Sequence, residues 1–396
     1  MEYMTVRDAA RRWGVTERLV QRLCADGRIN GAEKFAGSWR IPEGAPKPAD
    51  PRRTPAPSRP RRLSSDHTNL MPLMSSAFEP GHAREFVESL DAGPRADIAR
   101  SELSYFTGCA SEAVELAGRH LASEELGIRL SACLICAYAN LTLGRIERAC
   151  SALEMARGAL AQASLADPRL RAAEGFVAQT ASVLLHLPAP ANAPDAGEVM
   201  PLLPPGLRAF ALYVRAHAAY LSGDYAHSLG IAETALLAME AVYPIPSIYL
   251  HLVAVMDLVS LRRADEARRH LLAAWELARP DDLIEGFAEH HGLLGGMLEA
   301  VIKPAWPEDF RRIIDITYRF SAGWRRVHNP VTGDDVADNL TTTEFAASML
   351  ASRGWTNAEI AQHMGVSPHT VKSCISSALR KLGVSSRQEL RRFMLA

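Results

Sequence analysis

The sequence lacks the long apolar run of a membrane protein and the cysteine framework of a secreted one. No apolar run reaches the roughly 18 residues that a membrane span requires, and the charged residues 1–12 do not resemble a signal peptide. The six cysteines follow no disulfide pattern. We therefore expect a cytoplasmic protein that makes no contact with a membrane.

Signatures of catalysis and of metal binding are also missing. The sequence has no Gly-Lys pair of a phosphate-binding loop, no His-Glu-x-x-His and no Gly-x-Ser-x-Gly. Cys133 and Cys136 lie in an Ala- and Leu-rich helical run without the partners of a zinc site, so we interpret them as buried small hydrophobes. His290 and His291 are neighbours on different faces of a helix. We expect no catalytic residue, no metal and no cofactor.

Charge is balanced over the whole chain but segregated along it. The net charge is −1, yet residues 66–335 hold 23 basic against 34 acidic residues. Residues 1–65 carry +7 and residues 336–396 carry +3. Random fluctuation would explain the +3 alone but not the whole pattern. Basic ends suit phosphate binding, and an acidic middle has no reason to touch DNA.

One pattern is present near both ends of the chain. It reads Ala-x-x-x-Gly-Val-Thr/Ser-x-x-x-Val and occupies residues 10–20 and 361–371. In a helix-turn-helix the small residue lets two helices approach, glycine takes the angle of the turn, and the next apolar residue fills the corner. Thr or Ser then caps a second helix whose exposed face can enter a DNA groove. The two copies predict DNA-reading units at both ends.

Residues 1–44 are predicted to form a winged helix-turn-helix. Thr5-x-x-Asp8 resembles a capping box that opens the first helix. Thr16 is expected to cap a second helix to about Asp26, and residues 32–41 read as a hairpin bent at residues 36–38. The segment resembles excisionase and MerR-like DNA-binding domains through Met4-Thr5-Val6-x-x-Ala9-Ala10, Trp13-Gly14-Val15-Thr16, Gly27-Arg28-Ile29 and Trp39-Arg40-Ile41-Pro42.

This resemblance implies DNA contacts from the second helix and from the wing. In that family the helix enters the major groove, and the wing contacts the backbone or the minor groove. Carried over, the contacts fall on Arg18, Gln21, Arg22, Lys34, Ser38 and Arg40. The open alternative is that Arg22 or Arg40 pairs with a nearby acidic side chain. Trp39 is interpreted as a core residue.

Residues 45–77 are predicted to be a Pro/Arg-rich linker, and residues 78–335 a helical-repeat domain. Seven prolines between residues 42 and 60 keep the linker extended, as a tether. In the repeat region a turn followed by a small residue recurs in four segments, whose last positions lie 36, 79 and 39 residues apart. The segments are residues 107–113, 143–149, 222–228 and 261–267.

The repeat region resembles tetratricopeptide repeats with longer spacing and degenerate motifs. A generic helical bundle is the alternative. Stacked helix pairs create a concave surface that suits a small-molecule ligand, a peptide or a protein partner. The sequence does not choose among these, so we expect a sensor or docking domain of unspecified ligand.

Residues 336–396 are predicted to form a four-helix unit. Capping boxes at residues 341–344 and 356–359 open the first two helices. Ser367-Pro368 opens the third, which ends at Gly383, and residues 385–395 form the fourth. The unit resembles the LuxR-type helix-turn-helix through Asn357-x-Glu359-Ile360-Ala361, Thr370-Val371-Lys372 and Lys381-Leu382-Gly383-Val384-Ser385-Ser386-Arg387.

By that resemblance the third helix enters the major groove and the closing helix supports a dimer. The residues implied are Lys372, Ser373 and Ser376 in the groove, Thr356 and Thr370 near phosphate, and Leu390 and Phe393 in the dimer. Three positions depart from the family pattern. Thr343 stands where Arg is usual, Cys374 where His is usual, and Ser376 where a basic residue is frequent.

The sequence therefore predicts a mainly α protein with a tetratricopeptide-like helical middle between two helix-turn-helix units. Its expected function is that of a sequence-specific bacterial transcriptional regulator, homodimeric on double-stranded DNA and not an enzyme. One alternative is a protein-interaction scaffold in which the repeats carry the function. The other is a recombination accessory protein, against which the LuxR-type end argues.

Overall fold

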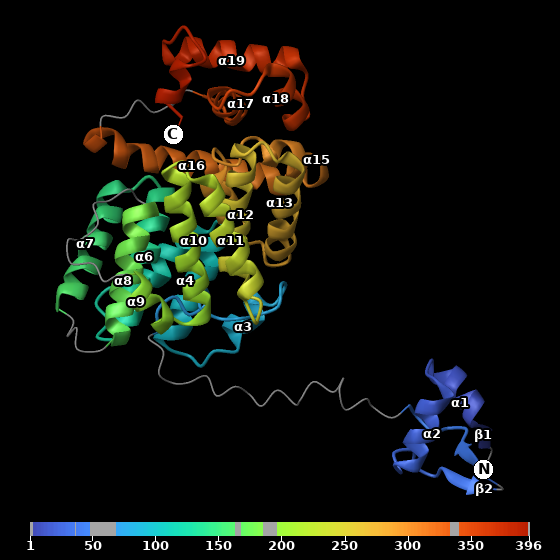
Figure 1. Ribbon diagram of the computed structural model, residues 1–396. Helices are drawn as coiled ribbons and strands as arrows, with labels where there is room; N and C mark the ends of the chain where they lie inside the picture. Colours follow the sequence, from blue (N-terminus) through green and yellow to red (C-terminus); the bar gives the residue numbers. More distant parts are fainter. Residues whose placement is uncertain are drawn as a thin grey trace. The chain divides into compact units, whose positions relative to one another are not determined.

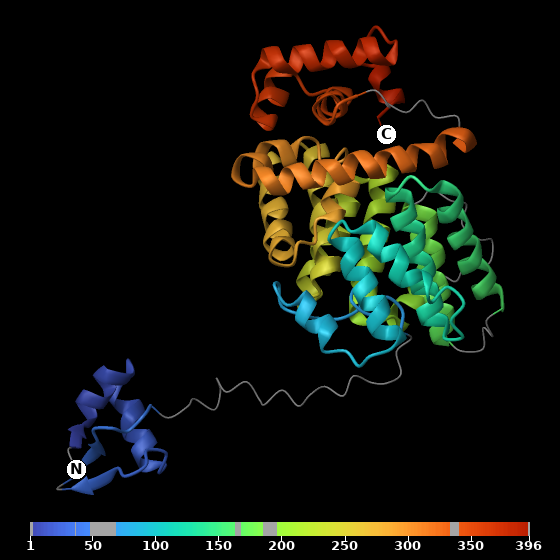
Figure 2. The same cartoon turned by 180° about the vertical axis from the view of Figure 1, so that it is seen from behind.

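The computed structural model describes residues 3–35, 37–47, 69–162, 168–184, 196–332 and 340–394. The chain divides into two compact units, residues 1–66 and 67–396 (Figures 1 and 2). Helices dominate, in agreement with a mainly α protein. None of the described helices combines the length and the apolar character that crossing a bilayer demands.

The first unit contains two helices and a three-stranded antiparallel sheet. Its elements are β1 (Tyr3–Thr5), α1 (Val6–Trp13), α2 (Glu17–Ala25), β2 (Glu33–Phe35) and β3 (Ser38–Pro42). The hairpin of β2 and β3 lies where the sequence predicts it. The pairing of β1 with β3, which sets Met4 opposite Ile41, was not predicted.

Local caps set the helices of this unit. The expected capping box of Thr5 and Asp8 is present, and Gly14 takes the left-handed turn with φ of 64°. The expected cap at Thr16 is only partly correct, because its backbone is extended but its side chain accepts no capping hydrogen bond. The first N–H groups of α2 therefore lack this partner. Val20 and Ile41 are fully buried in the core between helices and sheet.

The second unit begins with a helical body in which consecutive helices pack in pairs, notably α4 with α5, α6 with α7, α10 with α11 and α12 with α13 (Figure 1). The helix α16 lies against α6, α7 and α14. The elements are α3 (Ala83–Glu88), α4 (Pro94–Phe106), α5 (Ala110–Gly118), α6 (Leu126–Thr142), α7 (Ile146–Gln162), α8 (Pro168–Leu184), α9 (Ala196–Val199), η1 (Met200–Leu202), α10 (Pro205–Leu221), α11 (Tyr225–Ala238), α12 (Pro244–Ser260), α13 (Ala264–Ala278), η2 (Arg279–Asp281), α14 (Glu285–His290), η3 (Leu298–Ile302), α15 (Lys303–Ala305) and α16 (Pro307–Thr332).

The four predicted turns are present between paired helices. Gly108, Gly144 and Gly223 take positive φ angles of 81°, 68° and 81°. At the fourth turn the equivalent residue is Arg262, with φ of 61°, a conformation that non-glycine residues rarely adopt. The small residues that follow the turns are buried, as the close approach of two helices requires; they are Ala113, Ala149, Ser228 and Ala267.

The helical body starts before residue 78, so residues 69–77 of the expected linker belong to it. Leu70 and Leu73 are buried in its core. The carboxylate of Glu102 accepts hydrogen bonds from the amides of Leu73 (2.8 Å) and Met74 (3.0 Å). The sequence does carry a signal for this burial, since apolar side chains recur there at every third or fourth residue, and the predicted linker boundary did not take it into account. Residues 48–68, which hold most of the predicted tether, lie outside the described residues.

One carboxylate joins the beginning of the helical body to the turn after α13. Asp281, after α13, accepts hydrogen bonds from the amides of Gly81 (2.6 Å) and Ala83 (2.9 Å) at the start of α3. These amides open a helix and have no partner within it. The contact joins residues about 200 positions apart in the sequence.

The C-terminal part of this unit contains α17 (Thr342–Ser352), α18 (Asn357–Met364), α19 (Pro368–Leu382) and η4 (Glu389–Arg392). The predicted fourth helix is a short 3₁₀ turn instead of an α-helix. The Glu389 carboxylate accepts from the amide of Ser385 at 2.9 Å, so the segment is organised by local bonds. A piece this short gains few α-helical hydrogen bonds.

The packing of residues 69–77 on α10 can be tested with a single methyl group. A Cβ at Gly206 would lie 2.5 Å from the Met74 carbonyl oxygen, whereas one at Gly158 in α7 would meet nothing within 4 Å. We expect Gly206→Ala to destabilise the protein by about 1 to 3 kcal/mol, because overpacking moves backbone. Gly158→Ala is the control and should be neutral or stabilising in chemical denaturation. Equal stability of the two variants would contradict this packing.

Candidate nucleic-acid interface

The helices α18 and α19 meet at a tight turn that the sequence pattern predicts. Gly365 takes φ of 64° and ends α18. The amide of Val366 donates to the carbonyl of Ala361 at 3.0 Å, which fixes the corner. Ser367 caps α19 by accepting from the amide of Thr370 at 3.0 Å, and Pro368 follows at the first helical position. These bonds set the angle at which α19 leaves the turn.

The helix α19 has one buried face and one polar, exposed face. Val371 and Ile375 are buried against α17 and α18. The candidate groove residues Lys372, Ser373 and Ser376 are all exposed on the other face. They lie within about one helical turn, so one groove could accommodate all three.

The two candidate phosphate-contact residues also lie at helix starts. Thr356 and Thr370 are exposed. The Thr356 hydroxyl donates to the Glu359 carboxylate at 2.8 Å, within the predicted capping box, and the Thr370 hydroxyl bonds that of Ser367 at 2.8 Å. Both hydroxyls stand beside backbone amides at a helix N-terminus, which is a favourable place for a phosphate oxygen.

An ion pair connects α17 to the recognition helix. The Lys381 ammonium lies 2.7 Å from the Glu344 carboxylate, which also completes the capping box of Thr341. Burial works to raise the pKa of Glu344, but the hydrogen bonds from Lys381 and from the Thr341 amide outweigh it and lower the pKa. Cys374 is half-buried on α19, and burial raises the pKa of its thiol. This thiol packs as an apolar group against the core of the domain.

The closing turn does not offer the dimer face that the resemblance implies. Leu390 is fully buried, and Phe393 packs with Leu340 and Met349 in a small cluster of the same domain. The closing segment is short, so its apolar side chains turn inward to cover α17 instead of outward. The exposed side chains here are those of Gln388 and Arg391.

In the first unit all six candidate contact residues are exposed. Arg18, Gln21 and Arg22 lie on one face of α2, three and four residues apart. Among the residues described in this unit, neither arginine has an ion-pair partner. Lys34 and Arg40 lie on the hairpin, as Ser38 does, and the Arg40 guanidinium stacks 3.9 Å from the Phe35 ring centre. Trp39 is half-buried against the core, as expected.

Polar side chains gather inside the helical body, between α4, α10, α12 and α14. The Glu289 carboxylate accepts hydrogen bonds from the hydroxyls of Tyr105 and Tyr249, the latter at 2.8 Å. The Tyr213 hydroxyl donates to Nε2 of His290 at 2.8 Å, because Nδ1 of that ring donates to a backbone carbonyl. Burial lowers the pKa of His290 to about 4 and raises that of Glu289 to about 7. Across the described ranges, no three metal-ligating side chains are grouped.

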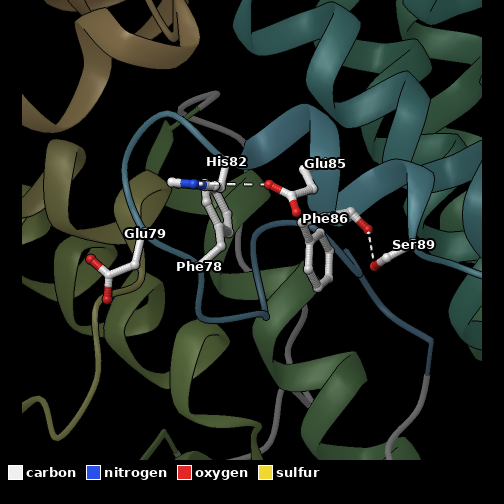
Figure 3. A pocket seen from close by; sticks show the side chains of 6 residues that line it. All are labelled: Phe78, Glu79, His82, Glu85, Phe86 and Ser89. Atoms are coloured by element: carbon white, nitrogen blue, oxygen red, sulfur yellow. Dashed lines mark hydrogen bonds and ion pairs between the residues drawn. The ribbon is translucent and has the colours of Figure 1, made fainter.

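A shallow hollow opens near α3, at the edge of the helical body (Figure 3). The rings of Phe78 and Phe86 stack at 5.9 Å, and His82 lies 3.9 Å from Glu85 across its rim. Ser89 Oγ donates to a backbone carbonyl at 2.6 Å. His82 and Glu85 lie within ion-pair distance and Ser89 bonds a backbone carbonyl, so three of the side chains at this hollow already have partners.

Two arginines that connect the C-terminal domain to the helical body were not predicted. Arg353, after α17, donates to the Tyr220 hydroxyl, and Arg262 donates to the Gly354 carbonyl at 2.9 Å. One signal for Arg262 was present in the sequence, since it stands in the turn where three equivalent segments have glycine. Nothing local distinguishes Arg353 from other surface arginines.

The ion pair between Glu344 and Lys381 makes the stability of the C-terminal domain depend on pH, and the lowered pKa of Glu344 gives the direction of this dependence. Because the pKa of Glu344 is lowered in the folded state, its stabilisation is present above the ordinary value of 4.5 and is lost as the pH falls. We expect Glu344→Gln, which keeps the capping geometry, to cost about 1 to 3 kcal/mol at pH 7. Amide exchange of α17 relative to wild type should show this difference at pH 7 and a smaller one near pH 4. A difference that grows on acidification would refute the assignment.

Comparison with known proteins agrees with this geometry. Residues 338–394 match the family described as bacterial regulatory proteins, luxR family. No curated protein and no solved structure matches the chain. The match covers α17, α18, α19 and η4 and leaves the first unit and the helical body outside it. The C-terminal domain is a LuxR-type helix-turn-helix domain, which supports a DNA-binding transcriptional regulator.

Proposed function

We propose that this protein is a sequence-specific transcriptional regulator that reads double-stranded DNA with α19. One observation carries the proposal: the capped turn at Gly365 presents Lys372, Ser373 and Ser376 on an exposed face, inside the segment that matches the luxR family. A lysine supplies phosphate or guanine contacts, and the two serines suit either base edges or phosphate. No step of this function requires catalysis.

The first unit is the second DNA-binding module of the proposal. Its two helices, the turn at Gly14 and the hairpin of β2 and β3 have the order of a winged helix-turn-helix. Unpaired cations on α2 and on the hairpin support this role. A module with few base contacts binds weakly alone, and a tether to a second module raises its effective concentration on the same duplex.

The helical body is the regulatory part of the proposal, with tetratricopeptide-like repeats that receive a ligand or a protein partner. Its paired helices and the recurring left-handed turns between them support a repeat architecture. Its polar cluster around Glu289 supports a responsive core, because groups that titrate near neutral pH concentrate at functional sites. A homodimer on DNA completes the proposal, with contacts other than Leu390.

Lys372 provides the direct test of DNA reading. The probe is a duplex that the full-length protein selects from a random pool. Lys372→Ala should weaken binding to it by about 1 to 3 kcal/mol, and the slope of log affinity against log salt concentration should fall by about 1. Lys303→Ala, an exposed lysine of the helical body, is the matched control and should bind as wild type. Unchanged affinity of the Lys372 variant in gel-shift titration would reject α19 as the reading helix.

Footprinting separates joint binding by both ends from binding by the C-terminal domain alone. If the first unit contacts DNA, removal of residues 1–65 shortens the protected region, and Arg22→Ala lowers affinity for the same duplex. Combined with Lys372→Ala, the Arg22 variant should approach non-specific binding, because each contact contributes separately. A footprint of the same length after the deletion would show that the first unit does not bind DNA.

A further inference from the structure

The LuxR-type domain packs on the helical body through a surface that does not include its DNA-reading face. The contacts come from α17, α18 and the turn between them, and they meet η3 and the residues before it. Trp355 and Met364, on this side, are buried. Lys372, Ser373 and Ser376 stay exposed while these contacts are made.

Arg353 of the LuxR-type domain inserts between side chains of the helical body. Its guanidinium donates to the Tyr220 hydroxyl and lies 5.7 Å and 6.0 Å from the ring centres of Tyr220 and Tyr225. Asp257, fully buried in α12, lies near enough for this cation to lower its pKa, although burial dominates and raises it to about 8. Two aromatic rings and a carboxyl form a favourable pocket for an arginine.

Arg262 of the helical body makes the reverse connection. Its guanidinium donates to the carbonyl oxygen of Gly354 at 2.9 Å, reaches the Glu359 carboxylate at 3.4 Å, and lies 5.8 Å from the Trp355 ring. The backbone of Arg262 is in the left-handed conformation that glycine takes in the other turns. A strained residue persists where its surroundings hold it, and such positions cluster at functional contacts.

Three glycines of the helical body leave room for side chains of the LuxR-type domain. A Cβ at Gly292 would lie 2.6 Å from the Phe345 ring, and one at Gly296 would lie 2.9 Å from the Met364 side chain. A Cβ at Gly295 would lie 2.8 Å from Val259 of the body and 3.3 Å and 3.5 Å from Leu350 and Met349 of α17. The Gly295 carbonyl also accepts a hydrogen bond from His363 at 2.9 Å. The recess fits the domain so closely that a single methyl group would obstruct it.

We propose that the helical body carries a docking site for the LuxR-type domain of its own chain. The site consists of Arg262, which reaches from the body to the domain, of Arg353, which reaches from the domain to the body, and of the glycine recess at residues 292–296. The docked domain keeps its reading face open, so docking fixes where the domain is held without blocking α19. The regulatory meaning of this contact rests on the proposed function. The contact itself is measured without DNA.

Arg262→Gly tests the docking contact in a chain that is expected to remain folded. Glycine suits the left-handed turn, so the helical body should be as stable as wild type or more stable. The guanidinium contacts are lost, and we expect amides of residues 353–364 in the full chain to exchange about tenfold faster. The substitution lies outside that segment, so faster exchange there reports lost contact. Arg268→Ala, an exposed arginine of α13, is the matched control and should change nothing.

Gly292→Ala gives an independent test by steric obstruction. Gly292 does not have a positive φ, so alanine adds volume without backbone strain. We expect faster exchange in α17 and α18 and unchanged exchange in α10 and α11. Gly230→Ala in α11, where a Cβ meets nothing within 4 Å, is the control.

Both variants should bind a selected duplex within about threefold of wild type, because neither change touches a groove residue. Exchange in α17 and α18 that stays at the wild-type rate in both variants would overturn the docking site. A loss of DNA affinity beyond about tenfold in both would overturn the open reading face. Absence of DNA binding by the wild-type chain would reject the proposed function and leave the exchange result intact as a test of docking.

Discussion

The turn that reverses the chain between two helices, with one residue in the left-handed conformation, is the constraint on which most of this molecule depends. It joins α1 to α2 at Gly14 and α18 to α19 at Gly365, and it joins the paired helices of the body. Side chains other than glycine take this conformation only at a cost in free energy. Arg262 is the exception among the paired-helix turns, and it is also the residue whose side chain reaches the neighbouring domain.

Buried carboxyl groups change how the charge of the middle region should be understood. Burial raises the pKa of Glu102, Asp257 and Glu285 to about 8 and that of Glu289 to about 7. At neutral pH Glu102, Asp257 and Glu285 are mostly protonated and Glu289 is about half protonated, so the four groups add little to the field outside the protein. The remaining carboxyls of residues 66–335 still outnumber the basic residues, 30 to 23. The net acidic character of the middle region therefore does not depend on these four buried groups.

Local patterns predicted the parts of the fold that local bonds determine. The capping boxes at Thr5, Thr341 and Thr356 are present because each joins residues three positions apart. The pairing of β1 with β3, the burial of residues 70–74 and the inward turn of Leu390 depend on partners far along the chain. No repeating pattern encodes such partners.

The residues of the candidate site also fall into those that a local pattern indicates and those that depend on partners far along the chain. The exposure of Lys372, Ser373 and Ser376 agrees with the helical period of α19, although these residues were expected in the groove from the LuxR-type resemblance. The contacts of Arg353 with Tyr220 join residues more than 130 positions apart, and neither residue type is unusual in its own segment. A local indication was present only at the turns between paired helices, where Arg262 stands at the position that is glycine in the other three turns.

The bonds from Asp281 to the amides of Gly81 and Ala83 have a consequence for how the body comes apart. Open repeat arrays lose their terminal repeats first, because an end repeat has a neighbour on one side only. Here the start of α3 is bonded to a residue that follows the pair of α12 and α13, so the first helix has a neighbour besides α4. The N-terminal end of the array is therefore tied to the residue after α13, and we expect it to unfold together with that helix instead of separately.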